Sequence, residues 1–278
     1  MTNTLINWEF IVVTLLKQVQ IKTGLLASFV LVAMSFSPAF ALDTKQIDKQ
    51  LTSMLQKIST YGQNQADDYE KLEATNDQML KLLKKSLVDP QMMKAPLKEA
   101  TANGLSAYVS DDKKLRCYCW DTQTGGSMHF FYSLIAYDAG NSKIKCNVLN
   151  PSNKNPEGED PGSCIEGVDT IKTTDGKNVY LVRDLFIGSG MIHGRSITAY
   201  TIANGKLIEY PFFQASKKLL KSINFGFGEY SDEAEIKLSS DKKTLKIPVI
   251  KKSEDDTGPA TGKYLNYVFN GTRFVFKK

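Results

Sequence analysis

Two short glycine-containing segments hold the side chains of this chain that could do acid–base or metal chemistry. The first contains Asp121 and His129, and the second contains His193 and Arg195. The sequence has no other histidine, and each of the two follows a pair of glycines. Two imidazoles and a carboxylate brought together could hold a metal ion or act as general acid and base. One hypothesis is therefore a hydrolase whose site gathers these four side chains at one sheet edge.

A structural interpretation of the same segments is simpler, and we favour it. Aspartate and threonine side chains commonly hydrogen-bond their own turn backbone, which would account for Asp121 and Thr122. Two histidines and one carboxylate make a thin metal site, so we predict neither a metal nor a cofactor. Glycines also let a backbone approach a ligand closely, which favours binding over catalysis. The predicted binding residues are Trp120, Thr122, Gly125, Gly126, Gly188 and Gly190.

The first 41 residues have the pattern of a secretory signal peptide. Lys17 and Lys22 precede an apolar run at residues 24–36, and the Ala-Phe-Ala of residues 39–41 supplies a small-x-small cleavage site. The apolar run is shorter than the roughly 20 residues that a spanning helix needs, and an uncleaved anchor is the alternative. Because the lead-in is long, translation could instead start near Leu16. We expect a periplasmic or secreted protein without an integral membrane anchor after cleavage.

All four cysteines follow the predicted cleavage site, and an even number in an exported chain indicates disulfides. Cys146 and Cys164 flank a stretch rich in proline and glycine. A disulfide that closes such a loop stabilises a fold by about 3 kcal/mol. Cys117 and Cys119 lie two residues apart in a strand-like run, where a bond between them would strain the backbone. We therefore predict a Cys146–Cys164 disulfide and leave the other two cysteines unassigned.

Residues 42–102 repeat their apolar side chains with the period of a helix. One helical face is formed by Ile47, Leu51, Met54, Leu55 and Ile58. Asp43 or Thr44 would cap this helix, and Gly62 would end it. A second amphipathic run ends at Pro90. We predict a helical hairpin that packs on the rest of the chain, with a partner-binding or dimerising coiled coil as the alternative.

Residues 103–278 predict antiparallel strands separated by Asn-Gly, Asp-Gly and Gly-Asn turns, with a helix-like interruption only at residues 214–221. Similar segments begin at Asp111, Asp175 and Asp241, at spacings of 64 and 66 residues. The predicted fold class is α+β: an N-terminal α-helical hairpin followed by a mainly antiparallel β domain. That domain would hold about three four-stranded meander units like propeller blades. A β-sandwich is the alternative.

The run from Lys114 to His129 resembles exported bacterial proteins of unknown function. Those proteins pair a helical N-terminal segment with a β-rich domain that contains a Trp-Asp-Thr-x-Thr-Gly-Gly stretch, which residues 120–126 match here. Residues 196–206 extend the similarity, which covers about residues 100–210. The resemblance implies the fold class and the export, and it implies no activity.

Composition narrows the classes of function. The 278 residues carry a net charge of +5, with 35 basic and 30 acidic residues. This near balance disfavours a nucleic-acid partner, which usually requires a concentrated basic stripe. Our first hypothesis is a non-enzymatic binding protein for another protein or an envelope glycan. The alternatives are the hydrolase described above and an immunity or inhibitor protein against a secreted toxin.

Overall fold

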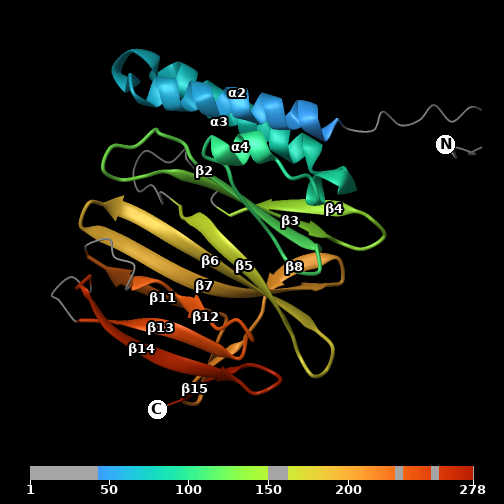
Figure 1. Cartoon of the computed structure of the whole chain (residues 1–278), viewed down its shortest axis with the longest axis vertical. Helices are drawn as coiled ribbons and strands as arrows, with labels where there is room; N and C mark the ends of the chain where they lie inside the picture. Colours follow the sequence, from blue (N-terminus) through green and yellow to red (C-terminus); the bar gives the residue numbers. More distant parts are fainter. Residues whose placement is uncertain (1–42, 150–161, 229–233, 252–256, 278) are drawn as a thin grey trace, which may run out of the picture. The chain divides into compact units, whose positions relative to one another are not determined.

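The structure is a computed structural model that describes residues 43–149, 162–228, 234–251 and 257–277. These residues belong to one unit, Leu42–Lys278. The predicted signal peptide and most of the stretch rich in proline and glycine lie outside the described residues. Within the described part, no helix combines the length and the apolar character needed to cross a membrane. The fold is α+β, with helices first and then antiparallel strands in three sheets (Figure 1).

The helices precede all of the strands. They are α2 (Thr44–Gly62), α3 (Gln65–Ser86), the 3-10 helix η1 (Pro90–Met93) and α4 (Lys98–Ala102). The Asp43 carboxylate accepts a hydrogen bond from the Lys45 N–H at 3.0 Å, which confirms the predicted N-cap of α2. The predicted end at Gly62 is also confirmed. The apolar faces of α2 and α3 are buried, and their innermost residues are Leu51, Leu55, Ile58, Leu72, Met79 and Leu83.

The first sheet packs directly under the helices. Its strands are β1 (Ser106–Val109), β2 (Leu115–Asp121), β3 (Phe131–Asp138) and β4 (Ile144–Val148), in the order β1-β2-β3-β4. Successive side chains of a strand point to opposite faces. On β2, Tyr118 and Trp120 therefore pack with the helices, whereas Cys117 and Cys119 pack with the second sheet. This burial on both faces explains why residues 117–120 of the strand are all apolar instead of alternating with polar residues.

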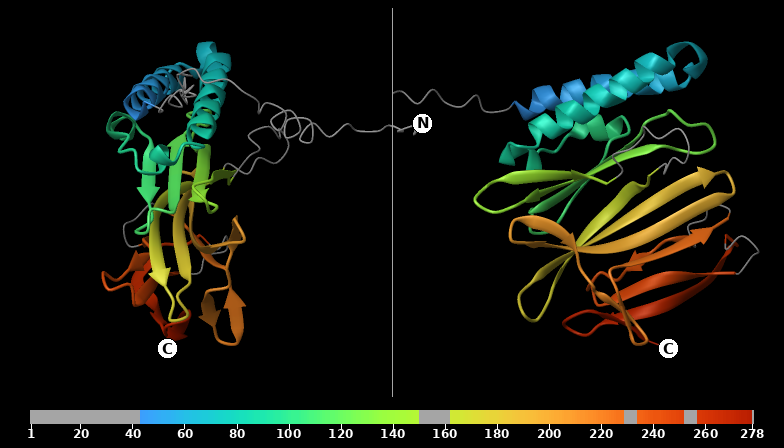
Figure 2. Two further views of the ribbon diagram at one scale, coloured as in Figure 1. Left: turned by 90° about the vertical axis from the view of Figure 1, so that its right-hand side faces the viewer. Right: turned by 180° about the vertical axis from the view of Figure 1, so that it is seen from behind.

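The second sheet lies in the middle of the β domain. It contains β5 (Cys164–Lys172), β6 (Asn178–Ser189), β7 (Ile192–Ala203) and β11 (Ser222–Phe227), in the order β11-β7-β6-β5, and β8 (Lys206–Glu209) also pairs with β7. Ile165, Tyr180 and Val182 face the first sheet. Ile171, Leu181 and Ile197 face the third. Figures 1 and 2 show the resulting stack of a helical layer and three sheets.

The third sheet contains β9 (Phe213–Ala215), β10 (Lys218–Leu220), β12 (Lys237–Leu238), β13 (Thr244–Ile250), β14 (Ala260–Phe269) and β15 (Phe274–Lys277). Their order is β10-β9-β15-β14-β13-β12, with β15 parallel to β9 and the other pairs antiparallel. The helix-like interpretation of residues 214–221 is wrong. The chain turns there through Ser216, at φ 56°, and pairs β10 with β9.

The hairpins that join β1 to β2, β5 to β6 and β12 to β13 have the same turn chemistry. In each, a Ser or Thr hydroxyl donates to the carboxylate two residues later, in the pairs Ser110–Asp112, Thr173–Asp175 and Ser239–Asp241. The internal similarity of the sequence matched Asp111 with Asp175 and Asp241. In the structure the residue at the equivalent position is Asp112. Asp112 also accepts from the Tyr180 hydroxyl at 2.8 Å, which ties the first sheet to the second.

The disulfide predicted between Cys146 and Cys164 is wrong. Cys164 is bonded to Cys119 instead, with 5.4 Å between the Cα atoms. The reason is the alternation of side chains across the first sheet. Cys146 packs toward the helices, whereas Cys119 faces the second sheet, where Cys164 begins β5. Cys117 is a free buried thiol and Cys146 a free half-buried one.

Candidate binding site

The segment between β2 and β3, residues 121–130, is folded onto itself by its own polar side chains. The Asp121 carboxylate accepts from the Gln123 N–H at 2.8 Å. The N–H and the hydroxyl of Thr122 both donate to the Phe130 carbonyl, each at 2.8 Å. These bonds confirm the turn interpretation of Asp121 and Thr122. We refer to residues 121–130, which run from the last residue of β2 to the residue before β3, as the WDT loop. The name comes from the Trp-Asp-Thr sequence at residues 120–122.

Helix α3 holds the WDT loop from above through Asn76. The Asn76 side chain is 2% exposed, and its amide N–H donates to the carbonyls of Thr122 at 2.9 Å and Leu72 at 3.0 Å. Gln65, at the start of the same helix, donates to the Gly125 carbonyl at 3.0 Å. Two residues of one helix therefore fix both halves of the loop.

Trp120, a predicted binding residue, is a core residue. Its side chain is 1% exposed and packs on Tyr132, with ring centroids 5.2 Å apart. Its indole N–H donates to the Asn76 side-chain oxygen at 2.9 Å. A buried ring cannot stack on a ligand from solution, so its contribution is to support Asn76 and, through it, the WDT loop.

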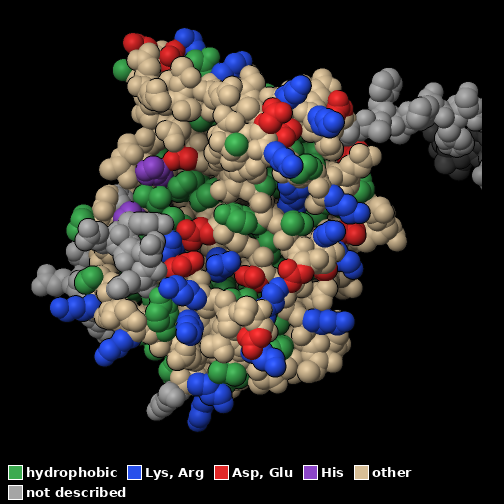
Figure 3. All heavy atoms as spheres, in the orientation of Figure 1, with side chains coloured by type: hydrophobic (Ala, Val, Ile, Leu, Met, Phe, Trp, Pro, Cys, Tyr) green, Lys and Arg blue, Asp and Glu red, His purple; other side chains and the backbone are tan. Residues whose placement is uncertain are grey.

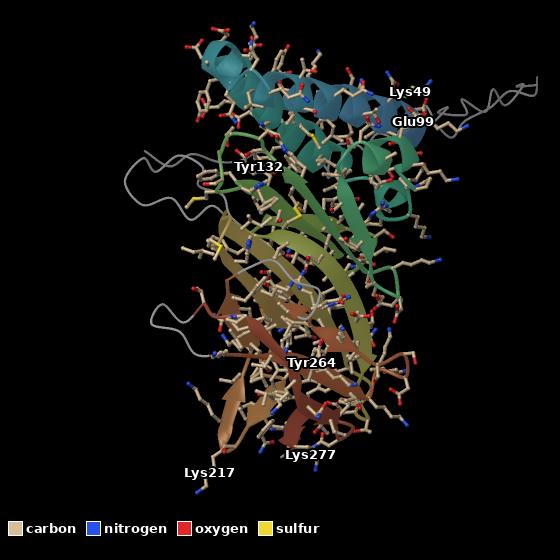
Figure 4. All side chains as sticks on the ribbon, turned by 60° about the vertical axis from the view of Figure 1, so that its left-hand side comes forward. Lys49, Glu99, Tyr132, Lys217, Tyr264 and Lys277 are labelled. Carbon is tan, nitrogen blue, oxygen red and sulfur yellow. A yellow bond between two sulfur atoms is a disulfide. The ribbon has the colours of Figure 1, made fainter. Side chains whose placement is uncertain are left out.

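A cavity of about 330 Å³ opens between α3 and the WDT loop. The helix contributes Tyr69, Glu70, Glu73, Ala74, Asn76 and Asp77, and the strand side contributes Thr122, Thr124, Phe130 and Tyr132. Figure 4 shows Tyr132 below the helical layer, at the level of the first sheet. We call this cavity the acidic pocket because its helical wall carries three carboxylates and no basic residue.

The carboxylates of the acidic pocket are not neutralised within the part of the chain that the structure describes. None of Glu70, Glu73 and Asp77 forms an ion pair there. Asp77 accepts a long hydrogen bond, 3.5 Å, from the Tyr132 hydroxyl. Burial raises the pKa of Tyr132, and the negative charge of Asp77 beside it raises the pKa further. The pocket is therefore strongly negative and has aromatic walls.

The predicted glycines differ in what they allow. A side chain at Gly125 would meet the Met128 carbonyl at 1.9 Å, and one at Gly188 would meet the Phe186 ring at 2.8 Å. At these two positions glycine permits close packing of the protein on itself. Gly126 and Gly190 have open space around them. At Gly125 and Gly188, neighbouring protein atoms therefore occupy the space that was predicted to admit a ligand.

The structure brings Asp121 and His129 together. The Asp121 carboxylate lies 2.5 Å from His129 Nδ1, and His129 stacks on Phe131 with centroids 6.0 Å apart. The backbone N–H of His129 donates to the Ile187 carbonyl of β6 at 3.0 Å. Ile187 is the cross-strand partner of His193. The two glycine–histidine segments, one from the first sheet and one from the second, are therefore joined by a backbone hydrogen bond, and histidine side chains show on one side of Figure 3.

The other two predicted residues have partners of their own. Arg195 makes a two-pronged contact with Glu166, at 3.1 and 3.2 Å, and its side chain is 5% exposed. His193 is buried and packs on Phe227, with centroids 5.4 Å apart. Asp121 and His129 are thus paired with each other, and Arg195 is paired with Glu166. Glu166 was missed because the sequence gives no sign that a bulge of β5 turns it toward Arg195.

A second cavity, of about 520 Å³, lies on the second sheet and is lined by Asp184, Phe186, His193, Arg195 and Ser196, among others. Asp184 accepts a hydrogen bond from the Ser196 hydroxyl at 2.7 Å. Burial raises the pKa of Asp184, against the opposing effect of this hydrogen bond. The folded state therefore holds a proton on Asp184 at pH values where the unfolded chain has lost it.

Replacement of Asp184 by asparagine should stabilise the protein at neutral pH. With the pKa raised in the folded state, wild-type stability falls as pH rises from the ordinary value of 3.8 through the raised one. We expect Asp184→Asn to gain on the order of 1 kcal/mol at pH 7, and the gain to vanish near pH 3. Urea unfolding across this range measures it.

Asp175→Asn is the control, because the Thr173 hydroxyl lowers the pKa of Asp175 and reverses the sign. Wild-type stability from Asp175 is present above its ordinary pKa and is lost as pH falls through the lowered one. A stability gap between wild type and Asp184→Asn that does not change with pH would contradict the inference.

The described residues contain no cluster of three or more His, Cys, Asp or Glu side chains that could hold a metal ion. Comparisons with protein-family models, with curated proteins and with solved structures found no match to this chain. The site therefore rests on its own geometry. The acidic wall of α3 was not predicted from the sequence, because acidic residues on a helix usually form a solvated face. The spacing of Glu70, Glu73 and Asp77 on one helical face was the available signal.

Proposed function

We propose that this chain is an exported binding protein that takes a basic side chain of a partner protein into the acidic pocket. The observation that carries the proposal is the combination of Glu70, Glu73 and Asp77 with the aromatic walls of the same cavity. Carboxylates attract a guanidinium or an ammonium group, and aromatic faces add a cation–π contribution. No step of chemistry is assigned to the pocket.

The volume of the pocket and the repulsion between its carboxylates both support binding of a basic side chain. About 330 Å³ lies at the small end of the range for ligand cavities, which suits one long side chain better than an extended glycan. Like charges three and four residues apart on a helix destabilise it slightly. Glu70, Glu73 and Asp77 therefore reduce the stability of α3, and a basic group bound between them would remove that cost.

Export and a repeated architecture are parts of the same proposal. The signal-peptide pattern and the Cys119–Cys164 disulfide support a periplasmic or secreted location. The three equal Ser/Thr-x-Asp turns support three related β-meander units that follow a helical hairpin. In this arrangement the helices cover the first unit, and the acidic pocket lies where they meet it.

Binding of a basic probe should depend on Glu73. We expect N-acetyl-arginine amide to shift the indole N–H resonance of Trp120, because Asn76 links that indole to the pocket lining. Glu73→Gln should weaken binding about tenfold, the effect of losing one charge-assisted hydrogen bond. The NMR titration should also weaken as salt concentration rises.

Glu99→Gln is the matched control, because Glu99 is an exposed helical glutamate outside the pocket lining (Figure 4). It should leave the titration unchanged. N-acetyl-citrulline amide, which has the shape of the arginine probe without its charge, should bind much more weakly. Equal binding of the two probes, or equal loss in both variants, would overturn the proposal.

A further inference from the structure

The third sheet turns one face to the second sheet and the other to solvent. Leu245, Ile247, Tyr267 and Phe274 belong to the core between the two sheets. The strand register then sets the side chains of the outer face. One row across this face runs through Lys237, Lys246, Asn266 and Lys277, which are cross-strand partners in succession and are all exposed. We call this row the lysine row.

The lysine row meets no carboxylate within its own sheet. The six strands of the third sheet contain five lysines and no Asp or Glu. The other two sheets differ, since β2, β3, β5, β6 and β8 all contain acidic residues. The carboxylates nearest in the chain among the described residues, Glu235 and Asp241, lie outside the strands, and Asp241 accepts bonds from its own turn. The positive charge of this face is therefore a local feature of a nearly balanced chain.

Two lysines of the row face each other directly across neighbouring strands. Lys237 and Lys246 are direct cross-strand partners, and like charges in that position destabilise a sheet. Neither Lys246 nor Lys277 forms an ion pair within the described residues. An anionic surface laid against the row would turn this repulsion into attraction.

The next row of the same face carries three apolar side chains beside the polar Gln214 and Thr244. Leu219, Val275 and Val268 lie on it, joined through Gln214, and Leu219 is 40% exposed. Tyr264 lies on the same face, with the Lys237 ammonium 5.4 Å from its ring centroid. Lysines beside aliphatic side chains and a tyrosine suit the interface of a bilayer, where charged heads meet phosphates and apolar stems enter the headgroup region. A soluble polyanion would use the lysines alone.

We infer that the outer face of the third sheet docks on an anionic phospholipid membrane. The lysine row contacts the lipid phosphates, and the row of Leu219, Val268 and Val275 contacts the headgroup–acyl boundary. Figure 4 places Lys277 and Tyr264 in the third sheet, at the end of the molecule opposite the helical layer. A protein docked this way would direct the helices and the acidic pocket away from the bilayer. This inference does not depend on the function proposed for that pocket.

Sedimentation with phospholipid vesicles tests this. The exported chain, residues 42–278, should bind vesicles that contain phosphatidylglycerol and should not bind pure phosphatidylcholine vesicles. Each lysine at an anionic surface contributes about fivefold to the partition coefficient, so Lys246→Gln with Lys277→Gln should lower it about 30-fold. The double variant loses no ion pair seen among the described residues, so its fold should be retained, as circular dichroism can check.

Lys45→Gln with Lys49→Gln is the matched control, since it removes the same charge from exposed positions on α2, where Figure 4 labels Lys49. It should keep nearly all of the binding. Equal loss in both double variants would reduce the effect to net charge and overturn the inference. Binding to dextran sulfate without binding to anionic vesicles would replace the membrane by a soluble polyanion, and equal binding to neutral vesicles would remove the role of the lysine row.

Discussion

Loss of the Cys119–Cys164 disulfide should lower the free energy of unfolding by about 4 kcal/mol, the chain-entropy value for a loop of this length. The bond closes 45 residues of sequence and joins the first sheet to the second. Without it the unfolded chain gains freedom, and the contact between the two sheets rests on packing and on hydrogen bonds such as those of Asp112 and the bond from the His129 N–H to the Ile187 carbonyl. Chemical unfolding of a Cys119→Ala, Cys164→Ala double variant measures the loss.

Two controls separate the disulfide from the removal of buried sulfur. Cys146→Ala removes a half-buried free thiol and should cost less than about 1.5 kcal/mol. A reducing agent should lower the free energy of unfolding of the wild type by the same amount as the double substitution does. It should leave the stability of the double variant unchanged. Both thiols of the pair are replaced so that Cys117, on the same strand, finds no partner. Equal stability of the wild type with and without reductant would contradict the assignment.

The sequence predicted what depends on short stretches of chain. The cap at Asp43, the end at Gly62 and the strands are local, because they follow from periodicity and turn residues. The strands of the structure lie within residues 103–278, the part for which antiparallel strands were predicted. The wrong helix prediction for residues 214–221 also has a local cause, because the turn at Ser216 was not recognised.

What the sequence did not predict depends on which segments meet in space. Cys146 and Cys164 looked like partners because they flank a loop, but the alternation of β4 turns Cys146 toward the helices. The parallel pairing of β15 with β9 joins strands from opposite ends of the third sheet's sequence. Neither contact has a signal in composition or spacing, because both are decided by the packing of one layer on another.

The candidate site divides in the same way. The turn bonds of Asp121 and Thr122 lie within one loop, and both were anticipated. The acidic wall of α3 lies about fifty residues earlier in the chain and was not. Asn76 carried no special signal, since one polar residue on a helix usually faces water. Its role depends on the packing of α3 over Trp120 and Thr122, which the sequence of the helix alone does not indicate.

Replacement of Asn76 by leucine should lower the free energy of unfolding by about 2–6 kcal/mol, although the two side chains are close in size. The change leaves the indole N–H of Trp120 and the carbonyl of Thr122 buried without their partner. Each such group costs about 1–3 kcal/mol. Thr75→Val is the control, because the Thr75 hydroxyl bonds only the carbonyl of Lys71 in its own helix, and it should cost less than about 1 kcal/mol.

A double-mutant cycle with Trp120→Phe distinguishes this hydrogen bond from general damage to the core. Trp120→Phe removes the donor that Asn76 accepts, so the indole bond is already lost in that background. Asn76→Leu should therefore cost less there than in the wild type, by about 1–2 kcal/mol. Strict additivity would mean that Asn76 and Trp120 act independently, and the hydrogen bond between them would then contribute nothing measurable to stability.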